Sequence, residues 1–201
     1  MQTSVEFLGH IVHREGVATD PKKIEAVRDW PRPTNIKEVR SFMGFAQYYR
    51  RFILFFSEIA APLYELTKKN VKFEWTDPCE EAFQLLKSKL IQAPVLAYPT
   101  RHDEFILDTD SSLYSIGAVL SQVQNGVERP IAYASKALSA SQKQYCTTMR
   151  ELLAIVVFVK HFHHYVWGKT FLLRTDHASL TWLCNFREPT GMLARLGGSQ
   201  F

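Results

Sequence analysis

The segment of residues 104–122 constrains the fold more than any other part of the chain. It reads EFILDTDSSLYSIGAVLSQ, two apolar runs joined by a short polar stretch. Side chains alternate between the two faces of a strand, so Phe105 and Leu107 fall on one face while Asp108 and Asp110 share the other. A carboxylate on a rigid strand is costly to bury unless it is solvated, hydrogen-bonded or bound to a cation. The segment therefore predicts a pair of strands whose acidic end is either a metal site or only the start of a turn.

Two further acids lie downstream of Asp110, in elements of different kinds. Glu151 falls near the start of an apolar helix that includes residues 148–156, and Asp176 ends a strand of residues 171–176. Carboxylates that converge from separate elements can hold two divalent cations about 4 Å apart, as two-metal phosphodiester hydrolysis requires. The order of these acids favours such a site, and the alternative for each of them is an ordinary surface carboxylate.

The C-terminal half predicts a mixed layer of strands and helices. A second strand over residues 116–122 and a third over residues 129–134 flank Asn125-Gly126, a dipeptide typical of tight β-hairpin turns. Three antiparallel strands in meander order, followed by a helix and another strand, indicate an α/β (α+β) fold with a mixed sheet. The proline-containing residues 93–99 predict a linker, so we expect a domain boundary near residue 100.

The N-terminal half predicts a short strand and then helices. Residues 5–12 are expected to form one strand. Asp20, followed by proline, is expected to cap a first helix. Thr34 or Asn35 is expected to start a second helix, and Glu38 is placed to complete a capping box from Asn35.

A third helix is expected over residues 78–90. Asp77 would be its N-cap and Glu80 the acid of its capping box. Helical spacing of apolar residues predicts which side chains of the three helices are buried. These are Ile24, Val27, Val39, Phe42, Met43, Ala46, Tyr49, Ala82, Phe83, Leu86 and Leu90.

Several motifs make the chain resemble the Pol polyprotein of gypsy-type LTR retrotransposons over nearly all of its length. They are FLGH at residues 7–10, RSFMGFAQYYRRFI at 40–53, PIAYASKALS at 130–139, and the acid-bearing TD, ELLA and TDH at 109–110, 151–154 and 175–177. The resemblance implies three parts. Residues 1–30 would be the end of the polymerase palm, with its primer-side hairpin, and the start of the thumb. Residues 31–99 would be the helical thumb and connection. Residues 100–201 would be a ribonuclease H-like domain.

The resemblance also implies roles for individual residues. Asp110, Glu151 and Asp176 would be the catalytic acids and the ligands of two Mg²⁺ ions, for which Mn²⁺ can substitute, and Asp108 would be only a neighbour. The substrates would be an RNA–DNA hybrid and the template–primer duplex. Contacts to the duplex are expected from Phe7, Gly9, His10, Lys37, Arg40, Arg50 and Arg51. For each arginine the alternative is a solvated position over an aromatic core.

The chain departs from the family pattern at several places. Ser111 replaces the usual alanine after Thr-Asp, and Cys146 and Met149 replace a serine cap and an acid at the start of the catalytic helix. Thr148 with Glu151 is a candidate replacement for the lost capping box. We also expect the ribonuclease H fold to be incomplete at its C-terminus, without its fourth aspartate and final helix. The palm aspartates are absent, so we expect no DNA polymerisation by this chain alone.

Two functions therefore remain as alternatives. One is a metal-dependent endonuclease that cleaves the RNA strand of a hybrid, joined to a thumb that grips the same duplex. The other is a catalytically inactive, nucleic-acid-binding remnant of a decayed element.

The amino-acid composition excludes few classes of function. The 201 residues carry a net charge of +4 and a pI near 8.9, which is compatible with a polyanionic partner. No apolar run approaches the roughly 20 residues that span a bilayer. We expect an intracellular, cytoplasmic protein without a membrane partner, working with the rest of its Pol polyprotein and also inside virus-like particles. The three cysteines are expected to be reduced structural thiols.

Overall fold

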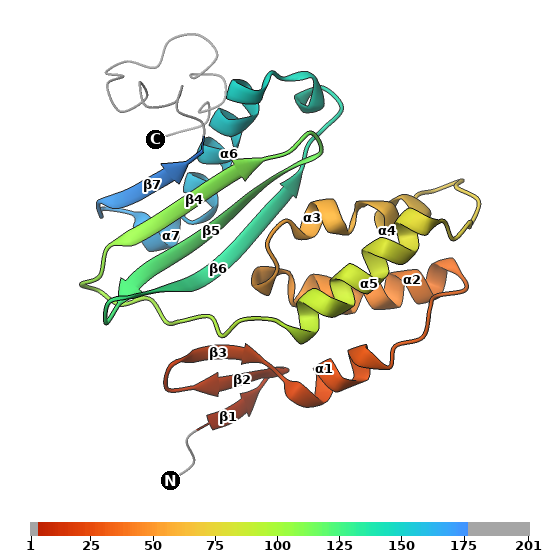
Figure 1. Ribbon diagram of the computed structural model, residues 1–201, viewed down its shortest axis with the longest axis horizontal. Coiled ribbons are helices and arrows are strands. Elements are labelled where there is room, and N and C mark those ends of the chain that lie inside the picture. The colour runs from red at the N-terminus through yellow and green to blue at the C-terminus, as the bar shows by residue number, and fades with distance from the viewer. Residues whose placement is uncertain (1–3, 177–201) are drawn as a thin grey trace.

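A four-stranded mixed sheet forms the larger layer of the structure, a computed structural model that describes residues 4–176 (Figure 1). The strand order is β6-β5-β4-β7, in which β4 (Phe105–Ser111), β5 (Ser115–Gln124) and β6 (Val127–Ala137) form an antiparallel meander. The fourth strand, β7 (Phe171–Thr175), pairs in parallel with β4. The predicted α/β fold with a mixed sheet is confirmed. His177, Cys184 and the expected C-terminal incompleteness of the fold lie outside the described residues.

The β5–β6 hairpin turns where the sequence predicts it. Asn125 and Gly126 both adopt positive φ, at 53° and 78°, as a tight hairpin turn requires. Both strands are longer than predicted, because their ends remain paired as far as Gln124 and Val127. One irregularity occurs opposite Pro130, which has no N–H to donate to the ladder.

Helices on one face of the sheet create its hydrophobic core. A short η2 helix (Gln142–Gln144) leads from β6 into α6 (Thr147–His161), and α7 (His163–Val166) follows; Figure 1 shows α6 and α7 behind the sheet. Leu107 and Leu120 are fully buried in the same cluster as Ala154 and Phe158. This packing fixes α6 against the end of β4 that carries Asp110.

The N-terminal strand prediction is wrong in one respect. Instead of one strand over residues 5–12, the chain forms β1 (Ser4–Phe7) and β2 (His10–His13), which pair antiparallel, and β3 (Gly16–Thr19) adds to β2. The turn falls at Leu8 and Gly9, whose φ values are 46° and 72°. Leucine rarely adopts positive φ, so its presence concealed the turn. Residues 7–10 form the turn of this hairpin, and their place beside a primer strand remains a prediction.

Six helices follow and form a second cluster of buried side chains. They are α1 (Pro21–Arg28), α2 (Ile36–Tyr48), the 3-10 helix η1 (Arg50–Phe52), α3 (Phe56–Ile59), α4 (Ala61–Leu66) and α5 (Asp77–Ile91). All the apolar residues predicted to be buried in α1, α2 and α5 are buried. Together these helices are called the helical segment below. Its η1 and α3 pack against β6, so the helical segment lies along one edge of the sheet (Figure 1).

Two of the three predicted helix caps form. The Asp20 carboxylate accepts from the Lys22 amide, and the Asn35 side chain accepts from the Glu38 amide. The cap predicted for α5 is wrong, because the helix begins one residue earlier and Thr76, not Asp77, is its N-cap. Glu80 therefore lies one position too far into the helix for a capping box, and its carboxylate accepts from the indole N–H of Trp75.

Within residues 4–176, no helix combines the length and apolar character that a membrane crossing needs. The two cysteines in this range, Cys79 and Cys146, are free thiols.

Candidate metal and nucleic-acid site

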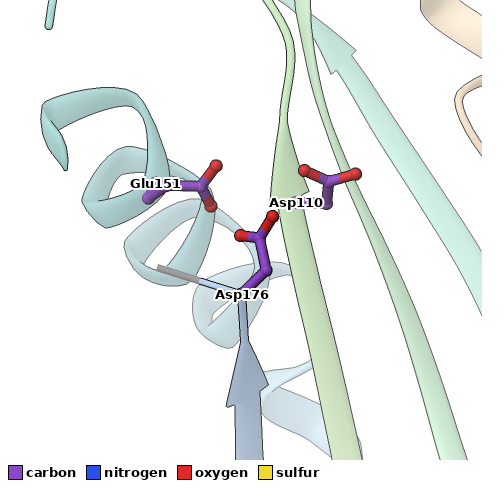
Figure 2. A group of neighbouring side chains, drawn as sticks. All are labelled: Asp110, Glu151 and Asp176. Carbon is purple, nitrogen blue, oxygen red and sulfur yellow. The ribbon is translucent and has the colours of Figure 1, made fainter. Parts of the chain in front are cut away.

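Three acidic side chains that are far apart in the sequence meet at one end of the sheet. Asp110 lies near the end of β4, Glu151 in the second turn of α6, and Asp176 directly after β7. One carboxylate oxygen from each lies within 4.8 Å of the others (Figure 2). The parallel pairing of β4 with β7 produces the contact, because Thr109 is in register with Thr175 and the two aspartates follow them.

Glu151 is the buried member of this cluster, with 3% of its surface exposed. Its Oε1 accepts hydrogen bonds from the Ser111 amide, at 3.2 Å, and from the Ser111 hydroxyl, at 2.6 Å. Its Oε2 is also buried and has no hydrogen-bond partner among the described residues. A buried carboxylate oxygen without a donor is costly unless a cation binds it.

The three negative charges of the cluster repel one another. Burial raises the pKa of the Asp110 carboxyl, and the nearby charges of Asp176 and Glu58 raise it further. Burial likewise raises the pKa of Glu151, with added repulsion from Asp176 and Asp110. Three carboxylates held this close resist simultaneous ionisation, so a bound cation would relieve their repulsion.

The donor set fits a hard divalent cation. All three side chains offer carboxylate oxygens, the ligands that Mg²⁺, Mn²⁺ and Ca²⁺ prefer. Asp110 and Asp176 are exposed, which leaves one side of the cluster open to solvent and to a substrate. On the buried side of the cluster, Glu151 Oε2 has no hydrogen-bond partner among the described residues and is available as a metal ligand.

The start of α6 differs from one expectation. The candidate capping box of Thr148 with Glu151 is wrong, because the helix begins at Thr147 and its N-cap is Cys146, which makes no side-chain capping bond. The hydroxyl that holds Glu151 belongs instead to Ser111. The sequence signal for this contact was the serine itself, which the sequence analysis singled out as a departure from the family pattern next to the first acid.

Asp108 has a partner of its own on β7. Its carboxylate accepts from Nε and Nη2 of Arg174, and the same guanidinium donates to both carboxylate oxygens of Glu128 on β6. The bond from Arg174 is the main cause of a lowered pKa at Glu128. Arg174 thereby ties β7 to the meander in the register that brings Asp176 beside Asp110.

Replacing Arg174 by Ala should lower the free energy of unfolding by about 1 kcal/mol, since it leaves two carboxylates facing each other at a partly exposed site. Urea denaturation measures this change. Lys136→Ala, which removes an exposed cation from β6, is the matched control and should have little effect. Equal effects of the two variants would contradict a specific role for Arg174.

Comparison with known proteins identifies the domain that carries Asp110 and Glu151; the matched residues end shortly before Asp176. Residues 75–173 match the family model described as an RNase H-like domain found in reverse transcriptase. The chain carries an RNase H-like domain of this family. The match begins before α5, and the predicted boundary near residue 100 remains a prediction.

Relatives of the whole chain are retrotransposon polyproteins. The chain is 42% identical over 192 residues to the retrovirus-related Pol polyprotein from transposon 412 of Drosophila melanogaster, which covers 96% of this chain and 16% of that protein. The corresponding polyprotein from transposon gypsy of the same organism is 37% identical over 205 residues, covering 96% of this chain and 19% of that protein. The resemblance to gypsy-type Pol polyproteins is confirmed, and the chain spans less than a fifth of these two relatives.

Solved structures share the fold. A foamy viral protease-reverse transcriptase (dRH) in complex with double-stranded DNA superposes with a TM-score of 0.80 at 20% identity, over 98% of this chain and 36% of that chain. A foamy viral protease-reverse transcriptase in complex with an RNA/DNA hybrid gives a TM-score of 0.76 at 19% identity, over 98% of this chain and 27% of that chain. The similarity therefore extends beyond the RNase H-like domain to the fold of the helical segment.

The predicted duplex-binding hairpin is held against α2 by aromatic residues. The ring of His10 lies 5.1 Å from that of Tyr48 and 5.4 Å from that of Tyr49, between centroids. The Tyr49 hydroxyl donates to the Gly9 carbonyl at 2.6 Å. Phe7 remains 62% exposed at the edge of this hairpin. A cavity of about 430 Å³ lies beside it, lined by Leu8, Gly9, Lys23, Phe45, Tyr48 and Tyr49.

The four predicted basic contacts do not gather at one place. Lys37 is exposed in the first turn of α2, and the Arg40 guanidinium donates to the Thr67 carbonyl. Arg50 faces the RNase H-like domain, where it donates to the Ser135 carbonyl at 2.7 Å. With Arg51 it lines a cleft of about 380 Å³ between η1, β6 and α6. Their roles in nucleic-acid binding remain predictions.

Proposed function

We propose that this chain supplies the ribonuclease H activity of a retroelement reverse transcriptase, cleaving the RNA strand of RNA–DNA hybrids with two divalent metal ions. The observation that carries this proposal is the convergence of Asp110, Glu151 and Asp176, with carboxylate oxygens within 4.8 Å of one another, in an RNase H-like domain.

The residues of the chain would have separate roles in metal binding and positioning. Asp110, Glu151 and Asp176 would hold Mg²⁺, with Mn²⁺ as a substitute. When bound, the two ions supply an activated water and stabilise the leaving oxygen. Ser111 fixes one oxygen of Glu151 and so directs the other toward the shared site. The exposed sides of Asp110 and Asp176 leave room for the phosphodiester backbone.

The helical segment and hairpin would grip the same duplex. Related foamy viral structures are complexes with double-stranded DNA and with an RNA/DNA hybrid, which supports a duplex as the ligand here. Contacts from Lys37, Arg40 and Arg51 would be to phosphates, and therefore weakened by salt and indifferent to sequence. As a part of a Pol polyprotein, the protein would work in the cytoplasm or in virus-like particles.

The test is incubation of the purified chain with an end-labelled RNA–DNA hybrid and Mg²⁺ or Mn²⁺, read as cleavage and retardation on one gel. Double-stranded DNA of the same sequence is the substrate control. Metal-dependent cleavage of the RNA strand alone is the expected result. Retardation without cleavage would overturn the proposed activity and leave a duplex-binding remnant, and the absence of both would overturn duplex binding as well.

A further inference from the structure

The turn between β4 and β5 follows directly after the site residues Asp110 and Ser111. Within it, the Ser112 amide donates to the Ser115 carbonyl at 2.8 Å, and the Ser112 oxygen accepts from the Ser115 amide at 3.0 Å. These bonds close the turn locally. The Ser112 hydroxyl also lies 3.2 Å from the Ser115 carbonyl, a longer contact to an acceptor that the Ser112 amide already uses. Within residues 112–115 the Ser115 hydroxyl has no acceptor of its own, so its proton needs a group from elsewhere.

That group is a carboxylate of the helical segment. Glu58 Oε2, on α3, accepts from the Ser112 hydroxyl at 2.6 Å and from the Ser115 hydroxyl at 2.8 Å. Ser115 is fully buried, so its hydroxyl has no access to solvent as an alternative partner. Hydrogen bonds to an ionised acceptor are among the stronger ones in proteins, at roughly 1.5–3 kcal/mol each.

Further contacts hold α3 in place on the sheet. The Phe55 ring lies so close to Gly117 that a Cβ on this glycine would be 2.5 Å from a ring carbon. Gly117 is the strand partner of Asp110 on β5. On β6, the Ser135 hydroxyl oxygen accepts from the Ser57 amide at 2.9 Å. The residue before α3, Phe55, adopts a left-handed φ of 54°, a conformation that persists only where surrounding contacts impose it.

A short chain of bonds connects Glu58 to the acids. Glu58 fixes Ser112, which is bonded covalently to Ser111, and Ser111 holds Glu151. Asp110 immediately precedes Ser111. Two of the three candidate ligands therefore depend on the placement of one turn that the helical segment holds from outside the sheet.

We infer that Glu58 is a positioning residue of the metal site, contributed by the helical segment to the RNase H-like domain. It acts through the hydroxyls of Ser112 and Ser115 and is not itself a metal ligand. The inference rests on the proposed function only in taking the acid cluster as a divalent metal site. It predicts that metal affinity falls when Glu58 can no longer accept these two bonds.

The experiment measures Mn²⁺ affinity of the full chain by titration, from the paramagnetic broadening of NMR amide signals near Asp110. Glu58→Ala should weaken Mn²⁺ binding about 10-fold, the lower end of the range seen when the hydrogen-bond partners of metal ligands are removed. Glu58→Gln keeps an oxygen acceptor and should restore the affinity to within about threefold of the wild type. Glu65→Ala, which removes an exposed acid of α4 paired with Lys68, is the matched control and should leave the affinity unchanged.

Thermal denaturation of each variant separates a positioning role from a structural one. A Glu58→Ala protein that melts earlier but binds Mn²⁺ like the wild type would overturn the inference. If that variant does not fold, Ser112→Ala replaces it, because it removes one of the two bonds and should still weaken Mn²⁺ binding. Mn²⁺ binding that depends on Glu58 without hybrid cleavage would refute the proposed activity alone, whereas a wild-type chain that binds no Mn²⁺ would refute the positioning role.

Discussion

Asp110→Asn is expected to abolish hybrid cleavage and, in the absence of metal, to raise the melting temperature of the protein. The variant removes one of three carboxylates that would hold the metal ions, so the transition state loses several kcal/mol of charge stabilisation. At 1.36 kcal/mol per tenfold, the cleavage rate should fall by at least about a hundredfold. The same substitution removes a negative charge from a cluster whose members repel one another.

The pH dependence of stability follows from the raised pKa values of Asp110 and Glu151. A carboxyl whose pKa is higher in the folded state stabilises the fold fully at pH values below its unfolded pKa, and this contribution is lost as the pH rises through the folded-state pKa. The contribution of these two carboxyls to the stability of the metal-free wild type should therefore fall as the pH rises from about 4 toward neutrality. Asp110→Asn should lose less over the same interval.

Differential scanning calorimetry between pH 4 and 8, with and without Mg²⁺, measures both effects. Mg²⁺ should raise the melting temperature of the wild type at neutral pH and raise that of Asp110→Asn much less. Asp29→Asn, at the exposed end of α1, is the control and should behave like the wild type in both respects. A variant and wild type with the same response to pH and Mg²⁺ would mean that Asp110 is an ordinary surface carboxylate.

Gly16→Ala should strongly destabilise the protein, by about 3 kcal/mol. Gly16 adopts a φ of 152°, and a Cβ at this position would lie 2.2 Å from the carbonyl oxygen of Leu96. That carbonyl accepts from the Val17 amide at 2.8 Å, and the Leu96 amide donates back to Val17 at 2.9 Å. The backbone cannot yield here without breaking this pair of bonds.

Urea denaturation of Gly16→Ala beside Gly44→Ala measures the effect. Gly44 lies in α2, where an added Cβ would have no atom within 4 Å, so its replacement by alanine should stabilise the protein by about 0.5–1 kcal/mol. Opposite signs for the two glycines are expected. Similar changes in the midpoint would show that the bridge between β3 and Leu96 contributes little to stability.

Local signals in the sequence were sufficient for much of the fold. Asn125-Gly126 gives the β5–β6 turn because its residues tolerate positive φ, and Asn35 with Glu38 begins α2 because a side chain and an amide three residues apart can bond. The order of the three acids, read together with the family resemblance, located the cluster. The turn between β1 and β2 was not predicted, because leucine rarely adopts the positive φ that Leu8 has there.

The contacts that hold the site in place could not be read from the sequence. Glu58 bonds to Ser112, 54 residues away, and Arg174 bonds to Asp108, 66 residues away. Periodicity and capping rules act over a few positions, and partners at such separations are determined only by how the elements pack. Ser111 was visible as a departure from the family, but its bond to Glu151 depends on where α6 crosses the sheet.

The paired amides and carbonyls of Val17 and Leu96 have a topological consequence. They join the two ends of a long excursion of the chain that contains all of α1 to α5, so the polypeptide enters and leaves the helical segment at adjacent points. The helices α1 to α5 are therefore placed like a domain inserted between Val17 and Leu96. Closing so long a loop has an entropic cost that no local contact offsets, so the bridge should form late in folding, after the helices have packed.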